Sequence, residues 1–175
     1  MLRFGPLRLH WSLLLGAALF CAVQPRPLLL LGYLAILAAH VVGHALAVAG
    51  APLRVEGVAL HALGGELLGT GEVTPLRRSV IAACGVAAQA LLLGLALLVS
   101  MPEDLRDAFT RRNGVMLLLN LIPIRPLDGA LAWKLPRRLL ASRRRKFRGE
   151  MRSSREVQKD VSELLRKIRG NTRVR

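Results

Sequence analysis

An apolar segment decides the fold of this chain, and it reads PLLLLGYLAILAAHVVGHALAVA over residues 27–49. Its length matches the roughly 20 residues that a helix needs to cross the hydrocarbon core of a membrane. Two histidines, His40 and His44, lie within the apolar run. Because residues four apart share one face of a helix, both imidazoles can bind the same ion. Ionisable side chains inside a membrane are costly and usually functional, so the spacing predicts a metal site rather than structural histidines.

Three further apolar segments accompany this one, at about residues 9–23, 80–100 and 115–133. Together they predict an all-α integral membrane protein with about four transmembrane helices. The last segment contains Pro123 and Pro126. A break at membrane depth is tolerated only where protein or a polar cavity satisfies the freed backbone groups, so this break indicates a site.

The net charge of +15 is concentrated at the C-terminal end. From Lys134 onward the sequence has sixteen Lys and Arg residues against four acidic ones. We therefore predict a transmembrane domain over residues 1–135 and a basic cytoplasmic tail helix over 136–175. Basic residues collect on the cytoplasmic side of membrane proteins. With four spans, this predicts a multi-pass protein of the cell (inner) membrane with both termini in the cytoplasm.

The connection between the second and third apolar segments has a different pattern. Polar and apolar residues partly alternate from Leu53 to His61, and glycines follow at Gly64, Gly65, Gly69 and Gly71. Alternation with glycine-rich punctuation is typical of strands and turns. We expect a short β-like hairpin or re-entrant loop over residues 52–75.

Asp128 follows the break in the last apolar segment and needs a polar partner there. Arg125, three residues earlier, offers an ion pair that needs no metal. The other interpretation joins Asp128 to His40 and His44. Two neutral imidazoles and a carboxylate form a three-ligand set that leaves the fourth zinc position open, as catalytic zinc sites do. We expect zinc as the cofactor.

Residues 4–135 resemble the site-2 protease family of intramembrane zinc metalloproteases, in its compact bacterial form. The resemblance rests on the order of four blocks: FGPLRLHWS at 4–12, HVVGH at 40–44, VEGVALHALGG at 55–65 and NLIPIRPLDG at 120–129. It implies that His40, His44 and Asp128 are zinc ligands and that Asn120 is a polar residue near the substrate. It also implies that the hairpin, with Gly64 and Gly65, receives an unwound segment of a single-span membrane protein.

One position departs from the family pattern His-Glu-x-x-His, in which the glutamate is the general base. Val41 stands in its place, and valine can neither accept nor deliver a proton. A positioned general base typically contributes roughly 10²- to 10⁴-fold to the rate. The sequence therefore predicts a metalloprotease of low or no activity. Glu66 and Glu72, in the adjacent loop, are the nearest candidates for a replacement base, and Gln89 is a candidate for an amide that the family carries in its third span.

Two other functions remain open. One is a catalytically inactive, zinc-holding pseudoprotease that binds membrane segments or regulates a partner. The other is a metal carrier, which ranks last because a four-span chain would have to oligomerise to form a pathway.

The composition of the tail indicates that it contacts membrane lipids. Its cluster Arg143-Arg144-Arg145-Lys146 has the composition that binds anionic headgroups. Apolar residues also recur at helical spacing, which predicts an amphipathic stripe; they are Val157, Val161, Leu164, Leu165 and Ile168. We do not expect nucleic acid as a partner, because Phe147 is the only aromatic residue in the tail and stacking on bases needs several.

Overall fold

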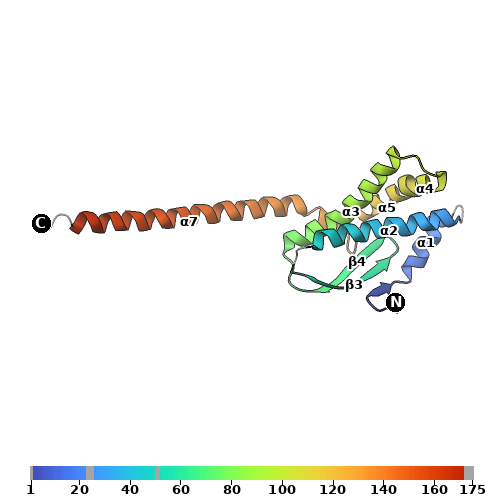
Figure 1. Ribbon diagram of the computed structural model, residues 1–175, viewed down its shortest axis with the longest axis horizontal. Coiled ribbons are helices and arrows are strands. Elements are labelled where there is room, and N and C mark those ends of the chain that lie inside the picture. Colours follow the sequence, from blue (N-terminus) through green and yellow to red (C-terminus); the bar gives the residue numbers. More distant parts are fainter. Residues whose placement is uncertain (1, 23–25, 50–51, 172–175) are drawn as a thin grey trace. The chain divides into compact units, whose positions relative to one another are not determined.

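The computed structural model describes residues 2–22, 26–49 and 52–171, and contacts divide the chain into units of residues 1–135 and 136–175. The helices, drawn in Figure 1, are α1 (Ser12–Cys21), α2 (Pro27–Val48), α3 (Pro75–Leu98), α4 (Glu103–Asp107), the π-helical turn η1 (Ala108–Arg112), α5 (Asn113–Asn120), α6 (Gly129–Ala132) and α7 (Leu135–Asn171). The strands are β1 (Leu2–Phe4), β2 (Leu7–Leu9), β3 (Arg54–His61) and β4 (Gly64–Thr70).

Two helices of the first unit are long and apolar enough to cross a membrane. They are α2, with 22 residues, and α3, with 24. Both begin at a proline, which suits the first helical turn because its backbone nitrogen needs no proton there. The apolar helix α1 has only 10 residues. The predicted fourth segment is not one helix, because α5 ends at Asn120 and α6 starts at Gly129.

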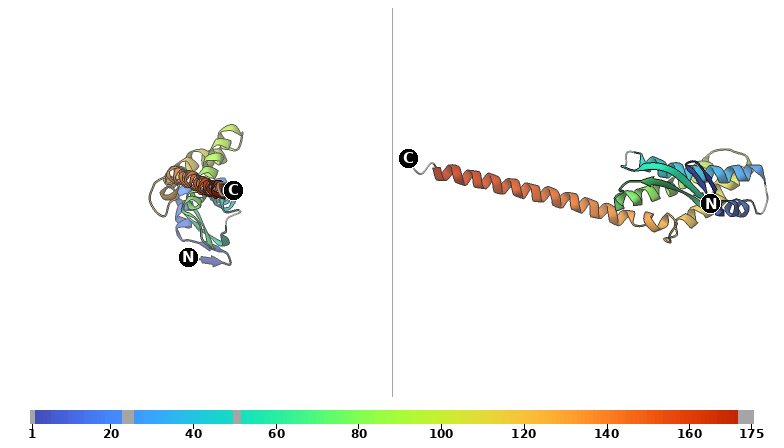
Figure 2. Two further views of the ribbon diagram at one scale, coloured as in Figure 1. Left: turned by 90° about the vertical axis from the view of Figure 1, so that its left-hand side faces the viewer. Right: turned by 90° about the horizontal axis from the view of Figure 1, so that it is seen from below.

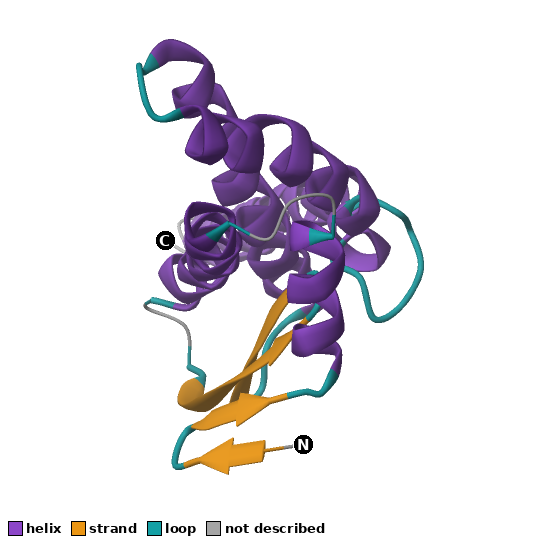
Figure 3. Ribbon diagram, turned by 90° about the vertical axis from the view of Figure 1, so that its right-hand side faces the viewer, coloured by secondary structure: helices purple, strands orange, loops and turns teal. Residues whose placement is uncertain are grey.

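A four-stranded mixed sheet lies beside these helices (Figure 3). Its strand order is β1-β2-β3-β4, with β2 and β3 parallel and the other two pairs antiparallel. The β3–β4 hairpin was expected from the alternating pattern. The two N-terminal strands were not, so the all-α prediction is too narrow, although the chain is mostly helical.

The turn of the hairpin is held inside the helical bundle by three helices. Tyr33 of α2 donates a hydrogen bond to the carbonyl oxygen of Ala62 at 2.8 Å, and the backbone N–H of Ala62 donates to Ser12 Oγ at the start of α1 at 3.3 Å. Asn120, the last residue of α5, donates to the carbonyl oxygen of Leu63 at 2.8 Å. Buried backbone groups need such partners wherever water is excluded. The hairpin is therefore re-entrant in form, with its tip among the helices.

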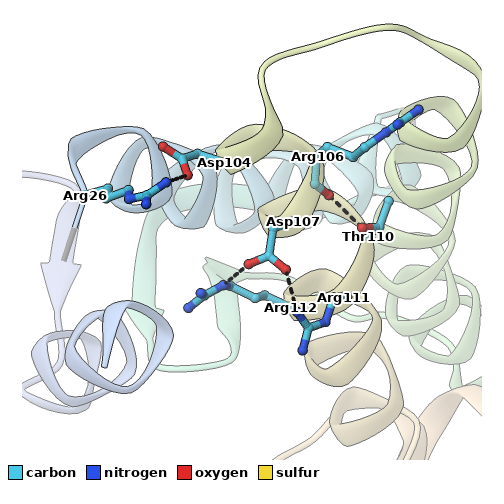
Figure 4. Close-up of polar contacts among 7 residues, drawn as sticks. All are labelled: Arg26, Asp104, Arg106, Asp107, Thr110, Arg111 and Arg112. Atoms are coloured by element: carbon cyan, nitrogen blue, oxygen red, sulfur yellow. Dashed lines mark hydrogen bonds and ion pairs between the residues drawn. The ribbon is translucent and has the colours of Figure 1, made fainter. Parts of the chain in front are cut away.

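Charged side chains join helices at the end of the bundle where α2 begins (Figure 4). Arg26, which precedes α2, forms an ion pair with Asp104 of α4. In η1, Arg112 donates through Nε to Asp107 at 2.6 Å and lies 5.4 Å from the centre of the Phe20 ring of α1. These contacts bring the connection after α1 and the segment after α3 to the same end of the bundle.

Candidate metal centre

Three side chains meet where α2 faces the segment before α6. His40 Nε2 and His44 Nε2 lie 2.9 Å apart, and each lies 3.2 Å from Asp128 Oδ2. The histidines are almost completely buried, at 2% and 4% exposure. The helical spacing predicted from the sequence therefore brings both rings to one point, and the chain break brings the carboxylate to the same point.

These three atoms have the separations expected of zinc ligands. Zinc bonds to imidazole nitrogen and carboxylate oxygen are about 2.0–2.2 Å long, so two ligands of a tetrahedral ion lie about 3.3 Å apart. The observed separations of 2.9, 3.2 and 3.2 Å are close to that value. The donor set of two nitrogens and one oxygen is also of the type that zinc prefers. The residues present thus fit the metal.

Hydrogen bonding around the site favours a bound cation. His44 Nδ1 lies 2.8 Å from the carbonyl oxygen of Ile81, which can only accept, so the ring proton is on Nδ1. In the neutral ring the lone pair of Nε2 then points at His40 and Asp128. Asp128 Oδ2 is buried and makes no hydrogen bond within the described ranges. Buried polar atoms rarely remain without a partner.

Arg125 does not take the role that the metal-free interpretation gave it. Its side chain is exposed, and the ion pairs of Asp128 among the described residues are with the two histidines. The carboxylate is therefore directed into the cluster rather than toward the arginine three residues before it.

The hairpin begins directly against the ligand-bearing face of α2. A Cβ atom on Gly64 would lie 2.7 Å from His40 Nε2, and one on Gly65 would lie 2.5 Å from Val41 Cγ2. Real Cβ atoms do not approach that closely, so alanine at either position would require the facing side chain of α2 to move. Val41 consequently faces the hairpin. A contact of Gly64 and Gly65 with substrate stays a prediction, because the described contacts are with α2.

A cavity of about 580 Å³ opens beside the cluster. Its walls come from α2, α3, the hairpin and the segment after α5, and they include all three candidate ligands together with Asn120. That volume is in the range of sites that bind small molecules or short segments. Glu66 also lines the cavity, whereas Glu72 is not among the described lining residues.

Two polar lining residues escaped the sequence analysis, His61 at the end of β3 and Arg78 in the first turns of α3. Burial lowers the pKa of His61, and the nearby His40 lowers it further. The lowered pKa favours the neutral ring. The only sequence signal for His61 was its place at the end of the alternating stretch.

Asn120 is fixed by contacts on two sides. Besides its bond to the hairpin tip, its amide donates to Gln89 Oε1 of α3 at 3.1 Å. Gln89 is fully buried, and its backbone carbonyl accepts from Asn113 at 2.9 Å. The side-chain amide of Gln89 thus contacts that of Asn120, the residue predicted to lie near the substrate.

No family model matches the sequence, and no curated protein matches it. A solved structure does: the site-2 protease from Methanocaldococcus jannaschii is similar with a TM-score of 0.59 and 16% sequence identity, over 77% of this chain and 68% of that chain. The chain has the site-2 protease fold. The predicted resemblance is confirmed at the level of the fold, and the two long apolar helices together with the site-2 protease fold indicate a membrane protein.

Proposed function

We propose that this chain is an intramembrane zinc protein of the metalloprotease type that cleaves peptide bonds slowly or not at all. The observation that carries the proposal is the meeting of His40 Nε2, His44 Nε2 and Asp128 Oδ2 within 3.2 Å of one another. A zinc ion held there would act as a Lewis acid on a peptide carbonyl and would acidify water. The three candidate ligands line a cavity, through which a substrate segment would reach the metal.

Low activity follows from the residue beside the first ligand. Proton transfer needs an acid–base group within hydrogen-bond reach of the reacting atoms. Val41 has none, and its methyl group packs against the backbone of Gly65. Glu66 and the neutral ring of His61 line the same cavity and are the candidates for a replacement base. If Glu66→Gln and His61→Gln both leave residual cleavage unchanged, neither residue is that base.

The hairpin supplies a place for an extended segment. In the described sheet, β4 pairs with β3 alone, and its residues line the cavity. The backbone groups of an edge strand can pair with another extended chain. We therefore propose a segment of a single-span membrane protein as the partner at β4, with Asn120 beside it.

A pseudoprotease is the second candidate, and Val41 favours it. A protein that keeps three metal ligands and a substrate edge but no base in the motif could capture a membrane segment without cutting it. Such a protein would hold or regulate its partner. Both candidates use the same metal and the same edge.

We further propose four membrane crossings in the cell (inner) membrane, with both termini in the cytoplasm. The Arg26–Asp104 ion pair supports this arrangement, because it joins the connection after α1 to the segment after α3. Alternating spans require these two connections at the same side.

Metal analysis tests the proposal first. Protein purified in mild detergent should contain one zinc per chain, and His44→Ala should lose it. The matched control is His10→Ala, since His10 precedes α1 and its ring contacts Ser12, outside the metal cluster. Wild-type protein without zinc, or His44→Ala with undiminished zinc, would overturn the metal assignment.

Cleavage is then measured with a generic single-span substrate in proteoliposomes. Zinc with no cleavage supports the pseudoprotease, and zinc with slow cleavage supports the impaired enzyme. Rapid cleavage by the unmodified chain would contradict the role given to Val41.

A further inference from the structure

The helix α7 carries a feature that the metal site does not explain. It runs without interruption from Leu135 to Asn171, as the right-hand view of Figure 2 shows, which corresponds to about 55 Å of helix. Between Arg137 and Arg148 the sequence has seven basic residues and no acidic one. From Glu150 onward acidic and basic residues alternate more evenly.

The apolar residues of α7 fall on one side. At 100° per residue, the described members of this side occupy an arc of about 120° around the helix axis, within which Arg143 and Glu150 also fall. Their side chains are exposed, for example 65% for Phe147 and 59% for Leu165. The described members of this apolar stripe are Leu139, Leu140, Phe147, Met151, Val157, Val161 and Leu165. Leu164 and Ile168 of the predicted stripe lie outside the residues whose side chains are described.

Basic residues border this stripe. Arg144, Arg148 and Arg155 follow one edge of the arc within about 60° of it, by the same helical geometry. Long basic side chains in that position can reach sideways to phosphate groups while the apolar residues beside them are buried. The pattern is that of a helix that lies in the plane of a membrane interface.

We propose that α7 lies in the headgroup layer of an anionic membrane surface, with the apolar stripe of Leu139 to Leu165 inserted and the basic residues on lipid phosphates. The run of seven basic residues supplies the charge complementarity. This inference does not depend on the metal site.

A second copy of the chain fits the stripe less well. Parallel coiled coils bury a narrow seam of sustained heptads, and an arc of about 120° is wider than such a seam. Two parallel copies would also bring their segments 137–148 together. All charged residues of this segment are basic, and like charges repel. Nucleic acid would match the charge but would leave the apolar stripe in water.

Probe depth in the full chain tests the proposal. Cys21 and Cys84, both partly buried, are replaced by serine, and a single cysteine for an environment-sensitive fluorophore is introduced by Val157→Cys or, as the matched control two residues away on the polar face, by Lys159→Cys. The protein is reconstituted in phosphatidylcholine vesicles with or without phosphatidylglycerol. Quenching by brominated lipid should be about threefold stronger at position 157 than at 159 in anionic vesicles, as a one-sided helix requires.

A second set of variants tests the role of charge. In it, Arg143, Arg144, Arg145 and Lys146 are all replaced by glutamine. The difference between the two positions should then disappear, while the zinc content of the protein stays unchanged, so a failure of this inference is separate from a failure of the metal assignment. Equal quenching at 157 and 159 in anionic vesicles would overturn the proposal. So would disulfide cross-linking of Val157→Cys between two copies that persists at low protein-to-lipid ratio.

Discussion

Along α2, the rings of His40 and His44 meet Asp128, whereas the side chain of Val41 packs beside Gly65 of the hairpin. The two histidines are polar and buried, and with Asp128 they supply three candidate metal ligands. At the position where the family pattern has its general base, Val41 is apolar and closely packed. Metal binding and proton transfer therefore depend on different side chains of one helix turn, and one can be lost while the other is kept.

Loss of the carboxylate should have the largest effect on this comparison. Asp128→Ala removes one of three ligands, and we expect zinc to fall to background in metal analysis of the purified protein. Arg125→Gln is the matched control, because the guanidinium forms no ion pair with Asp128 among the described residues. If Arg125→Gln removed the metal and Asp128→Ala did not, the ligand set would be wrong.

Restoring a general base at position 41 should show whether proton transfer can be regained without a change in metal binding. Val41→Glu is expected to raise cleavage of a single-span substrate by roughly 10²- to 10⁴-fold, the usual contribution of a positioned acid–base group. Val41→Gln has nearly the same size and no basic oxygen, so it should cleave no faster than wild type. Equal rates for the two variants would mean that the packing at Gly65, rather than a missing proton acceptor, limits catalysis.

A smaller change probes how the hairpin supports the ligands. The methyl group of Gly64→Ala would collide with His40 Nε2, so the ring must move, and we expect zinc affinity to fall roughly 10- to 100-fold, as for neighbours that orient metal ligands. Competition with a chelator measures the affinity. Gly94→Ala is the control, because a Cβ there meets nothing within 4 Å. Unchanged affinity in Gly64→Ala would mean that the hairpin does not position the ring.

The smallest expected effect lies at the hairpin tip. Tyr33→Phe removes the hydrogen bond to the carbonyl oxygen of Ala62, and this should lower the free energy of unfolding by about 1 kcal/mol. Denaturant titration in detergent would detect it. Zinc stoichiometry should stay at one per chain, and a loss of metal would show that the tip and the metal site are more tightly coupled than their contacts indicate.

Much of the candidate site was predictable because its information is local. The spacing of His40 and His44 depends only on helix geometry, and a carboxylate in an apolar segment interrupted by prolines draws attention without any tertiary knowledge. The hairpin was predictable from alternation and glycine. In each case a short stretch of sequence carries the pattern.

The unpredicted parts depend on pairings between distant segments. Strands β1 and β2 have three residues each, too short for a visible alternation, and β2 exists because Leu7–Leu9 pairs with residues 58–60, about fifty positions later. His61 and Arg78 line the same cavity only because the hairpin and α3 both pack beside α2. No local pattern reports such neighbours.

The hairpin tip also imposes an order on biogenesis. The ribosome completes β3 and β4 long before it reaches Asn120, which donates to the carbonyl oxygen of Leu63. Until α5 emerges, that carbonyl lacks its side-chain partner and is better solvated by water than by lipid. We therefore expect the hairpin to dock late. The thiol of Leu63→Cys should be open to a water-soluble reagent in nascent chains stalled with α3 outside the ribosome and α5 still inside it, and closed once α5 has been inserted. Early protection would show that the first three helices suffice to seat it.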